Sequence, residues 1–216
     1  MKYQYFIGID PGLTGCIAIH NMIEDTWKLH DVPIFTTKSP CKKNKSGFKI
    51  RNEYDILGIK QILSPYVGIA FATLEKLHAN PSAGGSKWSK VPEAVKMASG
   101  SIANFNNGVS MGVFRSALLY SGISYKLIAA PTWKKHRLPN LSDRSDKTQV
   151  LIATIECFPE LYEELQRAKD HNRAESVQIC TFGEQFFGGN DQYDRYSLDE
   201  DPDDIGELFI YSNAVP

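Results

Sequence analysis

The chain has 216 residues, of which 42% are hydrophobic and 23% are charged, and its formal net charge is −1. This length supports one substantial hydrophobic core, and the composition is that of a globular protein rather than a disordered or fibrous one. No run of 18 uncharged apolar residues occurs, which excludes a membrane-spanning helix. Because an apolar strand begins within the first residues, we expect a protein without a leader peptide. We therefore expect an intracellular protein, in the cytoplasm or an organelle matrix.

The net charge conceals an uneven distribution. Residues 188–216 hold eight of the 25 acidic residues and one of the 24 basic ones, so residues 1–187 carry a net charge of +6. We expect residues 1–187 to form one domain and residues 188–216 to form an acidic tail. A basic body with an acidic tail indicates a polyanionic partner for which the tail competes, and the alternative is a solvated extension.

The first predicted element is a buried strand over residues 5–9, all of them apolar or glycine. It ends at Asp10, and the glycine and proline residues within 11–15 predict a turn. Residues 16–19 are apolar again, so the first two strands are expected to form a hairpin. Asp10 therefore either begins a turn or faces a functional site.

Strands and helices then alternate along the chain, which predicts an α/β sandwich. In chain order we expect a strand over 26–34, a basic exposed loop or ribbon over 36–51, a helix over 52–66 with Asn52 as its N-cap, a strand over 67–75, a helix over 104–122, a strand over 123–131, and helices over 145–157, 159–168 and 170–183, the last closed by Gly183. Residues 76–103 show neither the helical nor the strand period.

Acidic residues lie at the ends of two predicted strands and in the apolar part of one predicted helix. Asp10 and Glu75 each end a buried strand, and Glu175 lies in the apolar part of the last helix, on the same face as His171. Acids from two strand ends and one helix can hold two Mg²⁺ ions, which together hydrolyse a phosphodiester. Turn or helix-start roles are the alternative, and for Asp170 the alternative is an N-cap.

Small residues recur on the predicted helix over 104–122. Gly108, Gly112 and Ser116 are spaced by four residues and therefore form one stripe. Such a stripe lets another backbone come close, and that backbone is either the sheet of the same chain or a partner subunit.

The chain resembles the RuvC-type Holliday junction resolvases in five segments that keep the family's order and spacing: GIDPGLTG, ATLEK, NFNNGVSMGVFRSALLYSG, APTWKKH and KDHNRAES. The resemblance covers about residues 3–183, and its second half, with CFPEL at 157–161, is most similar to the chloroplast, phage and viral branch. It implies an α/β fold with a ribonuclease H-like mixed sheet flanked by helices. It also implies a crossover junction endodeoxyribonuclease, a homodimer that nicks two opposing strands of a four-way DNA junction symmetrically.

The resemblance also implies a metal site. Asp10, Glu75 and Glu175 would bind two Mg²⁺ ions, for which Mn²⁺ would substitute, and either Asp170 or His171 would supply the fourth ligand or a proton-transfer group. Some family members place an acid three residues before the last one, where this chain has Asn172.

Basic residues near this site match family positions or are candidates for DNA binding. Lys134 and Lys135 follow the third buried strand and match family lysines, and Lys134 would hold the scissile phosphate. Lys147 and Arg173 are weaker candidates, for which ordinary surface charge is the alternative.

Residues 76–103 fall where these enzymes contact the centre of the junction. Trp88 would stack on bases, and Lys87 and Lys90 would contact phosphates, although a lone Trp is more often a core residue. Three other functions stay open: a ribonuclease H-like nuclease for RNA–DNA hybrids or RNA, a catalytically inactive scaffold, and an ATP-binding actin-like protein, which needs two such domains and is disfavoured by the chain length.

Overall fold

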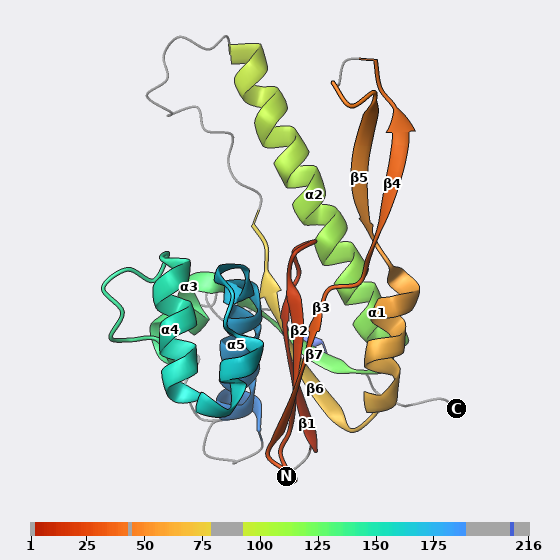
Figure 1. Cartoon of the computed structure of the whole chain (residues 1–216). Coiled ribbons are helices and arrows are strands. Elements are labelled where there is room, and N and C mark those ends of the chain that lie inside the picture. The colour runs from red at the N-terminus through yellow and green to blue at the C-terminus, as the bar shows by residue number, and fades with distance from the viewer. Residues whose placement is uncertain (1–2, 43–44, 79–92, 189–207, 210–216) are drawn as a thin grey trace.

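The computed structural model describes residues 3–42, 45–78, 93–188 and 208–209, which form a mixed sheet with helices on both faces (Figure 1). Its strand order is β3-β2-β1-β6-β7-β8. The three strands β1 to β3 pair antiparallel, β6 and β7 continue the sheet parallel to β1, and β8 pairs antiparallel with β7. The strands are β1 (Tyr5–Asp10), β2 (Cys16–Asn21), β3 (Thr26–Asp31), β6 (Ala70–Lys76), β7 (Ser124–Ala129) and β8 (Leu208–Phe209). This order confirms the predicted ribonuclease H-like sheet.

The helices divide between the two faces of the sheet (Figure 1). One face is covered by α1 (Ile56–Leu63) and α2 (Glu93–Tyr120), and the other by α3 (Ala130–Arg137), α4 (Lys147–Cys157) and α5 (His171–Phe187). Short 3-10 turns make up η1 (Ser64–Tyr66), η2 (Pro159–Glu164) and η3 (Ala168–Asp170). None of the helices in the described ranges is both long and apolar enough to cross a lipid bilayer.

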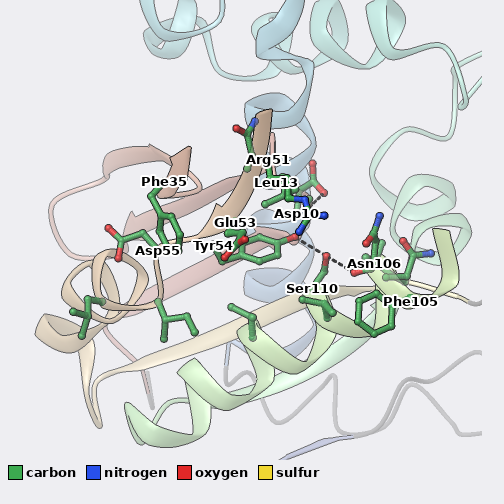
Figure 2. Close-up of a pocket in the computed structure, with 18 of the residues that line it drawn as sticks. Asp10, Leu13, Phe35, Arg51, Glu53, Tyr54, Asp55, Phe105, Asn106 and Ser110 are labelled. Carbon is green, nitrogen blue, oxygen red and sulfur yellow. Dashed lines mark hydrogen bonds between the residues drawn. The ribbon is translucent and has the colours of Figure 1, made fainter. Parts of the chain in front are cut away.

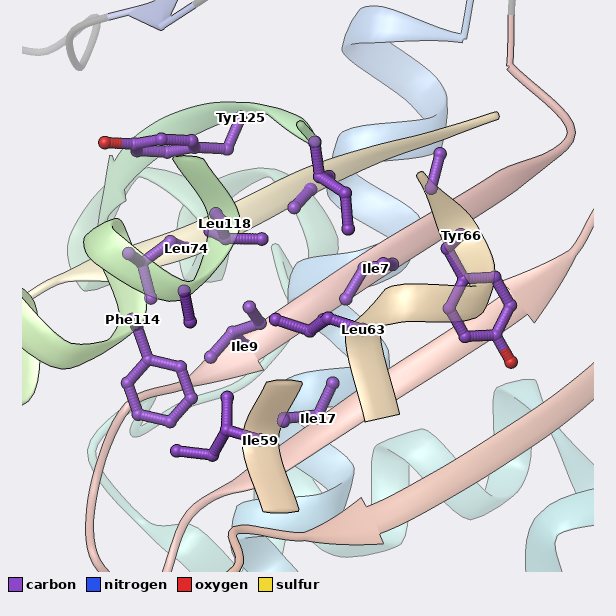
Figure 3. Close-up of a cluster of buried hydrophobic side chains, with 14 of the residues drawn as sticks. Ile7, Ile9, Ile17, Ile59, Leu63, Tyr66, Leu74, Phe114, Leu118 and Tyr125 are labelled. Carbon is purple, nitrogen blue, oxygen red and sulfur yellow. The ribbon is translucent and has the colours of Figure 1, made fainter. Parts of the chain in front are cut away.

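Alternate side chains of β1 point to opposite faces of the sheet, and each face has its own hydrophobic core. Ile7 and Ile9 point to the α1 and α2 face, where they pack in a cluster with Phe114 (Figure 3). Phe6 belongs to the cluster on the opposite face, which includes Val177 of α5. By the same alternation, Asp10 lies on the α5 face of the sheet.

Two glycines allow α5 to lie directly on the strands. A Cβ atom on Gly8 would collide with the backbone of Ser176 and Cys180, and one on Gly183 would collide with the Thr73 hydroxyl. Gly183 therefore lies inside α5, which continues to Phe187, and the prediction that it closes the helix is wrong.

The basic segment between β3 and α1 is a two-stranded ribbon, made of β4 (Ile34–Pro40) and β5 (Phe48–Tyr54), that stands away from the sheet (Figure 1). Every residue of β4 is exposed, and in β5 Tyr54 alone is buried. A backbone hydrogen bond of 2.9 Å from Asp55 to Pro33 closes the root of the ribbon. The predicted exposed loop or ribbon over 36–51 is thus a ribbon.

Several predicted boundaries differ from the structure. Asn52 lies in β5 rather than at a helix start, and Asp55 caps α1 by accepting a hydrogen bond of 3.0 Å from the Gly58 backbone. The predicted helix over 159–168 is the 3-10 turn η2. The helix predicted to begin at 104 begins at Glu93, within the stretch that lacked periodicity.

Part of the predicted acidic tail takes part in the sheet. Leu208 and Phe209 form β8, opposite Lys126 and Tyr125 of β7. The other residues from 189 onward lie outside the described residues. The helix α5 ends at Phe187, and the chain returns to the sheet at β8.

Candidate active site

Two carboxylates lie side by side at the ends of neighbouring parallel strands. The register of β1 and β6 sets Ile9 opposite Leu74, so the next residues, Asp10 and Glu75, come abreast. Neighbouring strands are about 4.8 Å apart and alternate residues share a face, so both side chains lie on the α5 face of the sheet. The predicted meeting of two strand-end acids is therefore present in the backbone geometry.

The third carboxylate comes from α5, where it crosses β1. Glu175 is 8% exposed, and the next residue, Ser176, fixes the helix to the ends of both hairpin strands. The Ser176 hydroxyl donates a hydrogen bond of 2.8 Å to the carbonyl of Cys16 and accepts one of 3.3 Å from the backbone N–H of Asp10. We call Asp10, Glu75 and Glu175 the acidic cluster.

The carboxylates of the acidic cluster interact electrostatically. Burial, followed by the charge of Glu175, raises the pKa of Asp10 to about 6. Burial, followed by the charge of Asp10, raises the pKa of Glu75 to about 7, against the opposing effect of a hydrogen bond from Trp133. Like charges held close disfavour their ionised forms, so a positive charge at this place is strongly favoured.

Two side chains of α3 contact the acidic cluster. The indole Nε1 of Trp133 donates a hydrogen bond of 2.9 Å to Oε2 of Glu75. The Nζ of Lys134 lies 2.6 Å from Oε1 of Glu175 and forms an ion pair whose side chains are 16% and 10% exposed. Lys134, which was predicted to lie near the site, thus contacts one of its three acids.

The acidic cluster has the donor atoms that a divalent cation needs. Carboxylate oxygens are the ligands that Mg²⁺ prefers. Three carboxylates whose negative charges repel one another favour the binding of a cation. Among the described residues, no three His, Cys, Asp or Glu side chains are grouped closely enough to hold a metal ion. Glu75 and Glu175 instead each direct one oxygen to α3. The residues fit Mg²⁺ by donor type, while Lys134 supplies the positive charge in this structure.

His171 and Asp170, the two candidates for a fourth group, have different surroundings. His171 is the first residue of α5, and it is close enough to Asp10 to lower the pKa of that carboxyl when the imidazole is protonated. Its Nδ1 donates to the Ala168 carbonyl at 2.9 Å and its Nε2 accepts from the Lys147 ammonium at 3.0 Å, because a carbonyl only accepts and an ammonium only donates. Lys147, predicted to contact DNA, is thereby placed at the edge of the acidic cluster.

Asp170 is held by a neighbouring arginine rather than by the acidic cluster. The side chain is 3% exposed, and both of its oxygens accept hydrogen bonds of 2.7 to 3.0 Å from Arg167. Burial acts to raise the pKa of Asp170, but the hydrogen bonds from Arg167 outweigh it and lower the pKa. The structure gives Asp170 the role of a partner for Arg167 at the helix start.

The other predicted residues fall into three groups. Lys135 is exposed on α3. Arg173 joins β3 to η2 through ion pairs with Asp31 at 2.7 Å and Glu164 at 2.8 Å, which is a structural role. The three predicted contacts with the junction centre lie outside the described residues: Lys87, Trp88 and Lys90.

Four residues that support the site were not predicted from the sequence. Trp133 binds Glu75, and its position directly before Lys134 was the available signal. The Asn172 amide donates to the backbone carbonyl and hydroxyl of Thr14 at 2.6 and 3.1 Å, so it fixes the turn after β1. The hydroxyl of Tyr54 lies 2.6 Å from that of Ser110 and donates to the Pro11 carbonyl at 2.9 Å, which fixes the same turn from the other side.

A groove with a volume of about 1190 Å³ begins at Asp10 and runs between the ribbon and α2 (Figure 2). We call it the ribbon–α2 groove. Residues of the turn after β1, of β5, of α1 and of α2 line it, and the hydrogen-bonded pair of Tyr54 and Ser110 stands at its inner end beside Asp10.

No protein-family model and no curated protein matches the sequence. Among solved structures, the chain is similar to RuvC from Thermus thermophilus with 10% sequence identity and a TM-score of 0.44, over 84% of this chain and 95% of that one. The ribonuclease H-like fold is described from the strand order of the chain itself and not from this likeness.

Proposed function

We propose that the chain is a metal-dependent, structure-selective endonuclease of the RuvC type that cuts four-way DNA junctions. The observation that carries this proposal is the acidic cluster, in which Asp10 and Glu75 come abreast at the ends of β1 and β6 and Glu175 of α5 is close enough to raise the pKa of both. Such a cluster costs stability, because burial and like charge oppose ionisation, and a cation-dependent function explains why it is present.

In this proposal Asp10, Glu75 and Glu175 hold two Mg²⁺ ions, or Mn²⁺ in their place. Bound ions of this kind supply an activated water and stabilise the leaving oxygen of a phosphodiester. Lys134, which already neutralises Glu175, binds the scissile phosphate and stabilises the charge that develops on it.

We propose His171 rather than Asp170 as the fourth functional group. The Nε2 lone pair of His171 accepts a hydrogen bond from Lys147, whose exposed side chain can turn to a DNA phosphate, and the freed nitrogen then takes a proton at the edge of the acidic cluster. Asp170 has both oxygens occupied by Arg167.

The proposed substrate requires two copies of the site. A four-way junction with two-fold symmetry is cut symmetrically by two active sites related in the same way, which a homodimer provides. A Cβ atom on Gly108 or Gly112 of α2 would meet open space, so this stripe does not pack on its own sheet and stays available for a partner subunit.

The motifs of the second half of the chain favour the chloroplast, phage and viral branch of these enzymes. The acidic tail is proposed to compete with DNA for the basic body.

The variant Asp10→Asn tests the proposal. It keeps the size of the side chain and removes one ligand charge, so we expect cleavage of a four-way junction in Mg²⁺ to fall by about a thousandfold or more, while binding in EDTA stays within a few-fold of wild type. The measurement is the rate of appearance of mapped nicks on labelled junctions, with linear duplex and RNA–DNA hybrid cut side by side.

The control is Glu156→Gln, which neutralises an exposed acid on α4 and should cut at the wild-type rate. In the same assay His171→Ala should slow cleavage and Asp170→Asn should not. A wild-type rate for Asp10→Asn rejects the site. Preferential cleavage of the hybrid by the wild-type protein instead supports the alternative ribonuclease H-like nuclease.

A further inference from the structure

The ribbon–α2 groove has one wall formed by a single face of the ribbon. In the ribbon, Thr37 pairs with Arg51 and Ser39 with Lys49. Because alternate residues of a strand share a face, Lys49 and Arg51 point to the same side, and both line the groove. The two positive charges therefore stand one after the other along one wall (Figure 2 labels Arg51).

The charge along this wall changes from positive at the outer part of the ribbon to negative near its root. Residues 34–54 contain six basic residues and one acid, Glu53, which is nearer to the root of the ribbon than Arg51. At the root, Asp55 is engaged as the cap of α1, and beyond it the groove reaches Asp10. The outer part of the groove therefore attracts anions, and the inner part ends at the acidic cluster.

The opposite wall, formed by α2, carries an exposed aromatic ring. Phe105 is 72% exposed and lines the groove next to Asn106 and Val109, across from the ribbon (Figure 2). An exposed phenyl ring costs free energy in water, and rings beside basic residues are typical stacking platforms for unpaired bases. A base inside a duplex is already stacked on both sides and offers no free face to such a ring.

The size of the groove favours a polymer. Its volume of about 1190 Å³ exceeds the range of about 300 to 1000 Å³ that is usual for small-molecule sites, and its lining comes from both the ribbon and α2.

We propose that the ribbon–α2 groove binds one unpaired strand of DNA and leads it to Asp10, with Lys49 and Arg51 on its phosphates and Phe105 stacked on a base. This inference rests on the proposed function and adds the path by which the substrate strand reaches the acidic cluster.

The test measures DNA binding by the full chain in EDTA, so that no strand is cut, with a labelled oligonucleotide, the matching duplex and a four-way junction. The double variant Lys49→Ala/Arg51→Ala should weaken binding of the oligonucleotide by about tenfold or more at low salt and reduce the salt slope by about 1.4, the value for two phosphate contacts on a single strand. Phe105→Ala should weaken binding of the oligonucleotide by about fivefold or more and leave the salt slope of binding unchanged.

The matched control is Lys28→Ala/Lys60→Ala, which removes two exposed charges outside the groove. If Lys49→Ala/Arg51→Ala binds the oligonucleotide as the control does, the inference is overturned. It is also overturned if duplex binding falls as much as oligonucleotide binding. Normal junction cleavage by the wild-type protein in those cases leaves the proposed function standing, whereas absence of any binding and cleavage by the wild-type protein rejects both.

Discussion

The hydroxyl of Ser176 joins three backbone segments around Asp10. It accepts from the N–H of Asp10, its one proton is shared between the carbonyls of Cys16 at 2.8 Å and Asn172 at 3.0 Å, and its residue is fully buried. The position of Asp10 relative to α5 thus depends on one side-chain oxygen. Because Glu175 directly precedes Ser176, the same contact fixes the spacing of two acids.

We expect Ser176→Ala to lower the free energy of unfolding by about 1 to 3 kcal/mol, since the buried N–H of Asp10 loses its acceptor. The cleavage rate should fall as well, because Asp10 is then less well held. Urea denaturation and the junction assay measure the two effects. Ser64→Ala, which removes an exposed hydroxyl on η1, is the control and should change the unfolding free energy by less than about 0.5 kcal/mol. Equal effects of the two variants would contradict this role of Ser176.

Residue patterns located the acidic cluster in the sequence but not its partners. Asp10 and Glu75 could be predicted to meet because each ends an apolar run, and parallel strands align their carboxyl ends. The contacts of Trp133 with Glu75 and of Tyr54 with Pro11 join residues 58 and 43 positions apart. Neither contact follows from a periodicity, because each depends on how separate elements dock.

The crossing of α5 over β1 depends on a residue without a side chain. Gly8→Ala would place a methyl group against the backbone of Ser176 and Cys180, neither of which can move without displacing α5. We expect a loss of about 3 kcal/mol or more in unfolding free energy, comparable to severe overpacking of a core.

The matched control for Gly8 is Gly108→Ala on α2, where an added methyl group meets open space. It should stabilise the protein by about 0.5 to 1 kcal/mol, because alanine is the better helix former. Thermal unfolding of the two variants gives the comparison. A tolerated alanine at position 8 would mean that α5 does not lie as closely on β1 as described.

A histidine links β2 to the end of α5. His20 Nδ1 lies 2.7 Å from Glu184 and Nε2 lies 3.0 Å from Asp25. Burial acts to lower the pKa of His20, but the hydrogen bonds and charges of these two acids outweigh it and raise the pKa.

The raised pKa of His20 predicts a pH-dependent stability. The protonated form gains its partners on folding, so its contribution is fully present below the unfolded pKa of about 6.5 and is lost as pH rises through the higher folded value. We expect the unfolding free energy of wild type to fall over that window relative to His20→Gln. Denaturant titrations at a series of pH values measure it, and parallel pH profiles of the two proteins would contradict it.

Element boundaries were harder to predict than element types. The strands over 5–9 and 16–19 were found because buried apolar runs are unambiguous there. The helical pattern predicts a helix start at Asn52, whereas the chain stays in β5 until Tyr54, because pairing of Tyr54 with Ile34 extends the ribbon to its root. Such pairing depends on a partner strand and leaves no periodic signal of its own.

At the scale of the whole molecule, the exposed stripe of α2 bears on assembly. Gly112 lies at its middle, with open space around the position of a Cβ atom. We expect the wild-type protein to be a dimer in solution and Gly112→Arg to be a monomer, because a long charged side chain prevents close approach of two helices. Gly112→Ala should remain a dimer. Light scattering after size-exclusion chromatography measures the mass, and a monomeric wild-type protein at micromolar concentration would contradict the assignment.

The root of the ribbon joins it to the rest of the protein, because Tyr54 is buried there and Pro33 accepts the hydrogen bond from Asp55. Its outer portion adds nothing to either core. The length and charge of this arm can therefore change without a penalty in folding, and under the proposed function the preference for a substrate would change there while the acidic cluster stays the same.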